Sequence, residues 1–375
     1  MSRPSRGRKR RRKTTSKVSD ARLLRNHSDQ LLVTHSSEIL PGRAMLILLN
    51  GTGLATQLIA ARPEVEWLLH TFEHLFVGSA SESLMEATDI PDTTPIELFC
   101  TPDLPNEEVQ TVILSTDSRG SGELLRDLVQ SSLSRLAAGG RLLVSTNNPK
   151  DHWLHEHLKS VCGRVTVHRE NRGVCYVARK SDTAGKQKSY TAEFAFRDGE
   201  RLVACVSRPG VFSHRRVDGG ARGLVRSLEH VTSPPASIVE MGCGCGAAAV
   251  AAAIRFPAAT VLGIDSHARA VHSTELTADA NKVANLAVRL TSDGVVPNAG
   301  TWDLFLCNPP YYSDFRISEL FLQSALDALR PGGRVHLVTK LTDWHGSRME
   351  ELFNDVQTAE YGEYSVLMCR AGDRF

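Results

Sequence analysis

Four consecutive residues, Asn308-Pro309-Pro310-Tyr311, are suited to handling a planar amino group. Such a nitrogen is a poor nucleophile because its lone pair is delocalised. The side-chain oxygen of Asn308 and the carbonyl of Pro309 can both accept hydrogen bonds from an NH₂ group and fix its orientation. Pro310 stiffens the segment, and Tyr311 offers a ring face to a base. In isolation Asn-Pro-Pro is more typical of a simple turn, so the neighbouring segments must decide between a turn and a functional site.

A glycine-rich turn, Glu240-Met-Gly-Cys-Gly-Cys-Gly246, lies about sixty residues upstream. It joins the apolar segment 237–241, which predicts a buried strand, to the Ala-, Val- and Ile-rich segment 247–256, which predicts a helix. Three alternate glycines let the backbone turn tightly and approach a ligand closely. Glu240 is placed to accept from a ribose hydroxyl or a ligand ammonium. Dinucleotide-binding proteins use a similar turn, but with the spacing Gly-x-Gly-x-x-Gly.

Further strands should bring acids to the same edge of a sheet. Asp265 ends the apolar segment 260–264, nineteen residues past Gly246, where α/β nucleotide folds hold a ribose-binding carboxylate. A helix N-cap is the alternative role, and it is compatible with ligand contact. Ser292-Asp293-Gly294 follows a third strand, where a side chain can reach an adenine edge, although a plain turn aspartate is an equal alternative.

The remaining elements complete an alternating pattern. Segment 303–307 predicts the strand that delivers Asn308, and 320–329 predicts a helix that leads to a strand over 334–339. Segments 353–356 and 364–369 are candidate edge strands. Strands that alternate with helices predict a mostly parallel sheet with its ligands at the carboxyl edge.

Together, in this order, the glycine turn and Asn-Pro-Pro-Tyr resemble the class I S-adenosylmethionine (SAM) methyltransferases that modify a planar amide-like nitrogen. The resemblance implies SAM as the cofactor and Asn308, Pro309, Pro310 and Tyr311 as the catalytic residues. The expected cofactor-binding residues are Glu240, Gly242, Cys243, Gly244, Gly246, Asp265, Ser266, Asp293, Gly294 and Asn308.

The chain also repeats itself. Residues 44–53, 136–144 and 163–180 resemble residues 238–244, 329–337 and 355–370. We therefore expect two tandem Rossmann-like methyltransferase domains with seven-stranded, mostly parallel sheets, of which the N-terminal one is degenerate. The expected divisions are a disordered basic tail (1–20), the degenerate domain (21–180), a linker (181–193) and the catalytic domain (194–375).

The first copy lacks the residues that carry the chemistry. Leu49 is expected where Glu240 stands, Ala55 where Gly246 stands and Thr71 where Asp265 stands. Ser115-Thr-Asp117-Ser118 takes the place of Asn-Pro-Pro-Tyr. We expect this copy to bind no SAM, to pack against the second copy and to hold substrate.

This layout is similar to the bacterial rRNA guanine-N2 methyltransferases, whose N-terminal domain is a degenerate copy of the catalytic one. Ser207-Arg-Pro-Gly-Val-Phe-Ser213 and Val217-Asp218-x-Gly220 match a family segment near the cofactor. The resemblance covers residues 30–375 and implies methylation of the N2 amino group of a guanine in 16S or 23S rRNA. Ala221-Arg222 after Gly220, where the family usually has Thr or Ser, and Tyr311, where many members have Phe, leave the target nucleotide open.

Two other functions are compatible with these motifs. Asn-Pro-Pro-Tyr also suits the carboxamide of a protein glutamine, although N5-methyltransferases of that kind normally carry a small helical substrate-binding domain. A nonenzymatic RNA-binding assembly factor is the second alternative, and the intact motifs of the second copy count against it. DNA adenine methylation is weaker, because no target-recognition domain is evident.

Composition agrees with a soluble globular protein, with 41% hydrophobic and 23% charged residues. No apolar run is long enough to span a membrane, and the N-terminus lacks the apolar core of a signal peptide. The eight cysteines form no Cys-x-x-Cys pair, so we expect reduced thiols, no metal site and a cytoplasmic monomer.

Charge is concentrated at the N-terminus. Residues 1–17 hold nine Lys or Arg and no acid, whereas the remaining 358 residues hold 35 bases and 42 acids. We expect this tail to contact the phosphate backbone of ribosomal RNA or a ribosomal subunit. A generic polyanion-binding tail and a nuclear signal are the alternatives.

Overall fold

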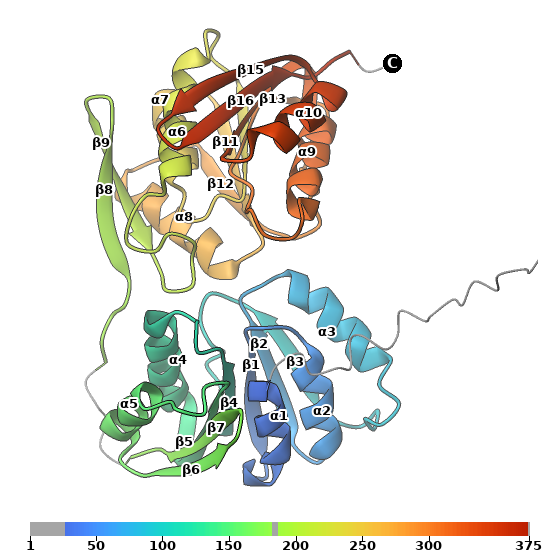
Figure 1. Cartoon of the computed structure of the whole chain (residues 1–375), viewed down its shortest axis with the longest axis vertical. Coiled ribbons are helices and arrows are strands. Elements are labelled where there is room, and N and C mark those ends of the chain that lie inside the picture. Colours follow the sequence, from blue (N-terminus) through green and yellow to red (C-terminus); the bar gives the residue numbers. More distant parts are fainter. Residues whose placement is uncertain (1–26, 182–186, 374–375) are drawn as a thin grey trace, which may run out of the picture.

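Each half of the chain forms a seven-stranded sheet in the computed structural model, which describes residues 27–181 and 187–373. The strand orders are β3-β2-β1-β4-β5-β7-β6 and β12-β11-β10-β13-β14-β16-β15. Neighbouring strands of these two sheets pair in parallel, except that β7 and β16 are antiparallel to both of their neighbours. Figure 1 shows one sheet with its helices above the other. The predicted fold class, two tandem Rossmann-like methyltransferase folds, is confirmed.

The first half carries its helices between successive strands. Its strands are β1 (Arg43–Leu48), β2 (Glu66–Thr71), β3 (Ile96–Cys100), β4 (Val109–Thr116), β5 (Leu136–Thr146), β6 (Val165–Glu170) and β7 (Gly173–Arg179). Its helices are α1 (His27–Thr34), the 3₁₀ turn η2 (Ser36–Glu38), α2 (Gly53–Ala61), α3 (Leu75–Met85), α4 (Gly122–Arg135) and α5 (Trp153–Cys162).

The second half repeats this order after an added hairpin. Its strands are β8 (Ala192–Asp198), β9 (Arg201–Ser207), β10 (Ser237–Met241), β11 (Thr260–Asp265), β12 (Leu286–Leu290), β13 (Trp302–Cys307), β14 (Leu329–Thr339), β15 (Asn354–Tyr361) and β16 (Tyr364–Arg370). Its helices are α6 (Gly219–Ser227), η3 (Leu228–His230), α7 (Ala247–Arg255), α8 (Ala268–Ala280), α9 (Arg316–Ala328) and α10 (Thr342–Leu352).

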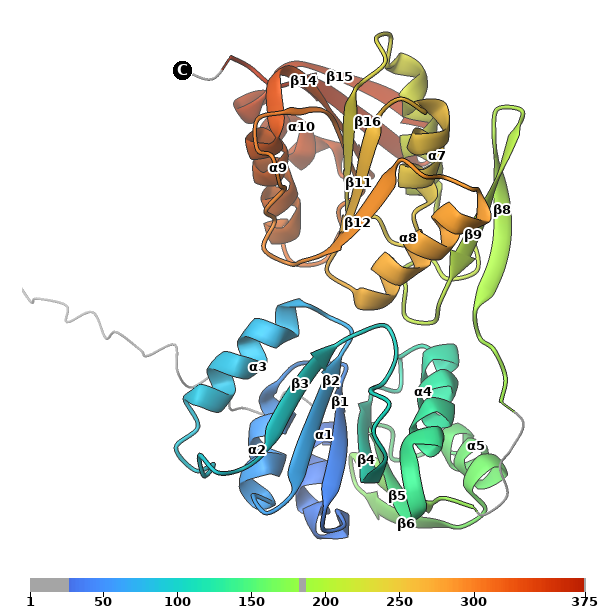
Figure 2. The same ribbon diagram turned by 180° about the vertical axis from the view of Figure 1, so that it is seen from behind.

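Helix α7 shows why the sequence folds in this way. Residues 247–253 are all buried, and they are small or β-branched side chains that let the helix lie close to the sheet. The β8–β9 hairpin turns at Gly199, whose φ of 60° suits glycine. The hairpin lies beside α7 and α8 in Figures 1 and 2, and Asn281, the C-cap of α8, holds β9 through both backbone groups of Ala204. The two strands pair antiparallel up to Asp198 and Arg201.

The sheet registers align the two halves residue by residue. Leu46 pairs with Leu69 and Ile113 in the first sheet, as Glu240 pairs with Gly263 and Leu306 in the second. The prediction that Leu49 stands in place of Glu240 was therefore wrong by three residues. The sequence comparison aligned Gly51 and Gly53 with turn glycines of the second half, and this shifted the alignment by three residues.

Helix α2 begins at Gly53, seven residues after Leu46, and α7 begins at Ala247, seven residues after Glu240, so the turns correspond without a gap. Counting from the strands, Leu48, Asn50 and Thr52 replace the three turn glycines. The predicted match of Ala55 to Gly246 was therefore wrong, and Thr52 is the equivalent residue. Thr71 does end β2 as Asp265 ends β11.

Candidate active site

The glycine turn of the second half adopts a backbone that other residues rarely reach. Gly242, Gly244 and Gly246 have φ values of 77°, 58° and 80°. A Cβ would lie 3.2 Å from Phe321 at Gly242 and 2.8 Å from Thr274 at Gly246, whereas at Gly244 it would meet nothing within 4 Å. Packing therefore requires the outer two glycines, and the open space beside Gly244 is where a ligand can approach the backbone.

Glu240 is a buried carboxyl with an unused oxygen. Its side chain is buried within the turn, and its Oε2 has no hydrogen-bond partner among the described residues. Burial raises the pKa of Glu240 well above its ordinary value. A buried acceptor of this kind requires a donor, and the ribose hydroxyls or the ammonium of SAM would supply one. The residues present thus fit the cofactor that the sequence motifs imply.

Asp265 is tied to the glycine turn. Its Oδ2 accepts from the Gly244 N–H at 2.9 Å, and its Oδ1 accepts from the His267 N–H at 2.9 Å. Burial raises the pKa of Asp265, although these backbone donors oppose the shift. The bond to His267 closes a turn two residues on; His267, and not Asp265, is the N-cap of α8, so the N-cap role given as the alternative is not observed.

Asn308 is oriented by a carboxylate from another element. Its Nδ2 donates to Oδ2 of Asp218 at 3.2 Å, and the same oxygen caps α6 by accepting from the Gly220 N–H at 2.8 Å. Tyr364 donates its hydroxyl to Oδ1 of Asp218 at 3.3 Å. Because an ionised carboxylate only accepts, the amide nitrogen of Asn308 must face Asp218, and its Oδ1 is left to accept from a substrate.

The residues after Asn308 differ in their exposure. Pro309 is buried, whereas the side chain of Tyr311 is 44% exposed. The hydroxyl of Tyr311 accepts from the Lys340 N–H at 3.1 Å, which holds the ring at the end of β14. Tyr312 is 73% exposed, so three aromatic side chains, with the 72% exposed Phe212, surround this edge of the sheet.

A small cavity of about 50 Å³ joins the two motifs. It is lined by Glu240, Gly242, Cys243, Gly244 and Asn308, together with Phe212, Ser213, Asp218 and their neighbours. The other predicted site residues do not line it, namely Gly246, Asp265, Ser266, Asp293, Gly294, Pro309, Pro310 and Tyr311. Asp293 is exposed and accepts from the Val295 N–H in its own turn, so the turn role predicted as its alternative is observed.

Sequence reasoning assigned no site role to Asp218. The Asp-x-Gly spacing was a usable signal, because an aspartate two residues before a helical glycine is typical of an N-cap. Only the fold shows that this N-cap lies beside the end of β13 and so reaches Asn308.

The first half contacts the loops on the cofactor side of the second half. Glu73 and His267 form an antiparallel bridge, the His74 N–H donates to Ser266 O at 2.8 Å, and the Ala268 N–H donates to Phe72 O at 2.7 Å. The Ser266 hydroxyl donates to Glu73 at 3.1 Å. The side chain of His74 also bonds Ser292 at 3.1 Å, beside Asp293.

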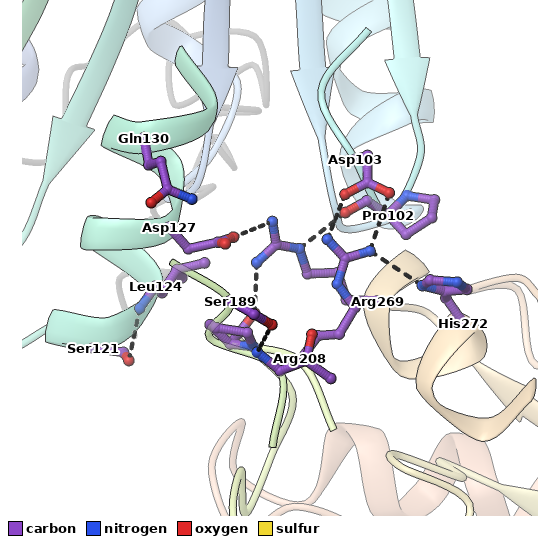
Figure 3. A network of polar contacts seen from close by, with 12 residues as sticks. Pro102, Asp103, Ser121, Leu124, Asp127, Gln130, Ser189, Arg208, Arg269 and His272 are labelled. Carbon is purple, nitrogen blue, oxygen red and sulfur yellow. Dashed lines mark hydrogen bonds and ion pairs between the residues drawn. The ribbon is translucent and has the colours of Figure 1, made fainter. Parts of the chain in front are cut away.

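Arg269 is the buried centre of the contact between the halves (Figure 3). Its side chain is 1% exposed, pairs with Asp127 of α4 at 2.7 Å and donates to Pro102 O at 2.9 Å. Its guanidinium also lies 4.3 Å from the centre of the Phe72 ring. Close by, Arg208 pairs with Asp103 and bonds His272 at 3.1 Å.

Comparison with known proteins finds a family model that matches this site. The model of the methyltransferase small domain matches residues 203–368, a region that contains the glycine turn and Asn308. The resemblance to rRNA guanine-N2 methyltransferases is also confirmed.

Curated relatives carry the name ribosomal RNA small subunit methyltransferase C. The Pseudomonas putida protein is 30% identical over 225 residues, which are 58% of this chain and 66% of that protein. The Pseudomonas aeruginosa protein is 36% identical over 145 residues, which are 38% of this chain and 42% of that protein. The chain thus spans from about two-fifths to just under two-thirds of these two relatives.

One solved structure matches both halves. The T. thermophilus 16S rRNA N2 methyltransferase, solved in complex with AdoMet and guanosine, aligns with a TM-score of 0.72 at 21% identity. The alignment covers 92% of each chain, so the tandem arrangement is shared. Among the described residues of the present chain, no helix is long and apolar enough to cross a membrane.

Proposed function

We propose that this protein is a SAM-dependent methyltransferase that methylates the N2 amino group of a guanine in ribosomal RNA. The observation that carries the proposal is the orientation of Asn308. Asp218 holds its amide nitrogen, and no hydrogen bond of the described residues uses its Oδ1. The names of the relatives and of the solved neighbour support the same activity.

The chain supplies orientation and charge stabilisation. Asn308 Oδ1 and the Pro309 carbonyl accept from the two N–H groups of the target amine and turn its lone pair toward the glycine turn. Glu240, which is buried, and Asp265, which accepts from the Gly244 N–H, would hold the cofactor on the side of Asn308 that faces the glycine turn. When bound, SAM supplies an electrophilic methyl group. Orientation and preorganised acceptors account for the rate, and no strong general base is required.

The remaining site assignments are part of this proposal. Gly242, Cys243, Gly244 and Gly246 form the cofactor turn, Ser266 supports Asp265, and Asp293 with Gly294 faces the adenine edge. Pro310 stiffens the loop and Tyr311 stacks on the target base. The half-exposed ring of Tyr311 supports that role, because its hydroxyl is already engaged and its ring is not.

The deciding experiment is methyl transfer from labelled SAM. Wild type and Asn308→Ala are each given small subunits, large subunits, naked rRNA and a ribosomal release factor. We expect label in one rRNA substrate that digests to N2-methylguanosine and a loss of roughly 10²–10³-fold in the variant, with SAM affinity nearly unchanged. Label in the release factor would instead establish glutamine methylation. SAM binding without label would count against every substrate offered.

The N-terminal tail lies outside the described residues, and its role is proposed from charge alone. Nine bases within residues 1–17 suit a phosphate backbone. Deleting them should weaken RNA affinity and reduce its dependence on salt, while turnover at saturating RNA stays the same. A collapse of turnover would place the tail in the active site.

We further propose that the enzyme acts as a monomer in the cytoplasm, where ribosomal RNA is available.

A further inference from the structure

A cavity of about 490 Å³ lies at the carboxyl edge of the first sheet. Its walls include the ends of β1, β4 and β5, at Leu48, Thr116 and Thr146. The sheet order reverses between β1 and β4, and open α/β sheets bind their ligands at such a reversal. The cavity is far larger than the one beside Glu240, and its volume is within the range of sites for small organic ligands.

The cavity is not a second SAM site. Leu46 replaces the carboxylate of Glu240, and Leu48 and Thr52 replace the outer two glycines of the turn. Asn50 stands where Gly244 leaves open space for a ligand. A leucine cannot accept from a ribose hydroxyl or bind an ammonium. The cavity therefore lies where such folds bind nucleotides, but it lacks the groups that would hold SAM.

The lining favours a ligand with N–H donors. Three carboxyl side chains line the cavity, from Glu73, Asp117 and Asp151, and the lining set includes no Lys or Arg. His267 is also uncharged at neutral pH, because burial lowers its pKa to about 4. A phosphate would therefore be repelled, whereas the ring N–H and amino group of a guanine could each find an acceptor.

Several polar groups are available to such a ligand. Asn50 and Ser118 are exposed, and no hydrogen bond is found for either side chain within the described structure. The Nδ1 of His267 is buried without a partner. Asp117 Oδ1 accepts from the Arg119 N–H and pairs with Arg119 Nε at 3.5 Å, whereas its Oδ2 accepts from Asn147 Nδ2 and keeps a further lone pair. Trp153 is 43% exposed, with the Arg126 guanidinium 5.1 Å from its ring centre and the His157 ring stacked at 5.8 Å. A base that stacks on this ring joins or displaces these groups.

The register makes part of the cavity wall the counterpart of the catalytic loop in the other half. Val109 pairs with Leu136 as Trp302 pairs with Leu329, so Asp117 and Ser118 correspond to Pro310 and Tyr311. The second half contributes Gly210 and His267 to the cavity wall. Gly210 lies two residues before Phe212, which lines the cofactor cavity. A ligand held here would therefore lie beside the entrance to the proposed reaction site.

We propose that this cavity binds one unpaired purine nucleotide of the RNA substrate, with guanine as the preferred base. The base stacks on Trp153 and donates to Asp117, while its phosphates stay outside the acidic wall. This inference rests on the proposed function and gives the first half a substrate-binding role. A free nucleoside has the same base chemistry, so the test must separate the two sources.

The first measurement is photo-crosslinking of full-length protein to the methylated rRNA segment carrying 6-thioguanosine, with the crosslinked peptides mapped by mass spectrometry. We expect crosslinks within residues 116–153, in addition to those near residues 308–312. Ser118→Phe, which fills the cavity from an exposed position, should remove the first set alone. Crosslinks confined to the catalytic loop would overturn the proposal. The readout needs RNA binding but no turnover, so it is independent of the proposed chemistry.

The second measurement is steady-state methylation by the same variant. Ser118→Phe should raise the KM for RNA roughly tenfold, since stacking of one base carries an effect of that order. Its kcat and SAM affinity should stay the same. Asn50→Leu, which removes an amide and keeps the fold, should act in the same direction, and the exposed Ser160→Phe on α5 is the matched control. An unchanged KM in both cavity variants would refute the RNA role.

Binding of free guanosine distinguishes the two possible occupants of the cavity, a nucleotide of the RNA substrate and a free nucleoside. Ligand-observed NMR with guanosine and with uridine should show weak, guanosine-selective binding that Ser118→Phe reduces. If guanosine binds tightly while the RNA crosslinks are absent, the cavity is a site for a free nucleoside and the RNA assignment fails. If wild type transfers methyl to no rRNA, the proposed function fails even where the crosslinks appear.

Discussion

At the scale of single residues, Asn308 depends on Asp218 more directly than on the prolines that follow it. The carboxylate determines which end of the amide faces the substrate, and it is itself fixed by the cap of α6 and by Tyr364. Asp218 is held by the Gly220 N–H and the Tyr364 hydroxyl as well as by Asn308, so the acceptor is oriented before substrate arrives.

Asp218→Asn tests this orientation. Asparagine is a good N-cap, so α6 should remain intact, but its amide can present either end and Asn308 is then free to turn. We expect kcat to fall about tenfold, with KM for SAM and the melting temperature close to wild type. Equal losses of kcat and stability would mean that Asp218 acts only on the fold.

The buried Glu240 predicts a pH dependence of cofactor binding. Its pKa is raised in the folded protein, so the free protein favours the protonated form, and its contribution to stability is lost as pH rises above the ordinary value of 4.5. Ligand donors favour the ionised form, so SAM binding should release a proton. Affinity should therefore increase as pH rises above the ordinary carboxyl pKa of 4.5.

Calorimetry in buffers of different ionisation enthalpy measures this proton release directly. Glu240→Gln should bind SAM more weakly and should flatten the pH dependence. Asp265→Asn is the comparison, because the pKa of Asp265 is also raised by burial. A pH dependence that survives in Glu240→Gln and disappears in Asp265→Asn would reassign the proton to the second carboxylate.

At the scale of elements, the order of strands and helices followed from the sequence because alternating apolar segments and glycine turns are local signals. The residue-by-residue correspondence between the strands of the two halves could not be predicted from the sequence. Leu46 and Leu49 are both apolar, so only the pairing with Leu69 and Ile113 identifies the residue that replaces Glu240. The role of Asp218 was hidden for a similar reason, since ninety residues separate it from Asn308.

The contacts between loops of the two halves could not be predicted from the sequence either. They lead to a testable prediction. Glu73 and His74 hold the loops that carry Asp265 and Asp293, although they come from the half without the motifs. Glu73→Ala with His74→Ala should raise the KM for SAM several-fold and leave kcat nearly unchanged, because the loops after β11 and β12 lose support.

Glu82→Ala on α3 is the matched control, since Glu82 is exposed on the same half. Glu73→Gln should restore most of the affinity, because an amide can still accept from Ser266. A rise in KM for RNA instead of SAM would show that these residues face the substrate.

At the scale of the whole molecule, Arg269 joins the two halves. Its guanidinium contacts Asp127, Pro102 and Phe72 of the first half from the start of α8. Arg269→Met should destabilise the protein by about 3–5 kcal/mol, because Asp127 is left without its partner and two halves that pack together lose a shared contact.

Thermal or urea unfolding measures this loss. The control is Arg215→Ala, which removes the pair with Glu123 at the same boundary, where the arginine side chain is 51% exposed. Solvent already screens that pair, so the melting temperature should change little. Similar losses in both variants would mean that the boundary depends on total charge and not on the buried contact.

The paired loops at this boundary have a consequence for the origin of the chain. Counting from the ends of β2 and β11, Glu73 and His267 are equivalent, and the two hydrogen bonds beside them are each other's image. A surface that complements its own copy is the contact of a symmetric dimer. Covalent connection turns that dimer into one molecule with an effective concentration in the millimolar range. Only one copy then has to keep its chemistry, and the other is free to change what it holds.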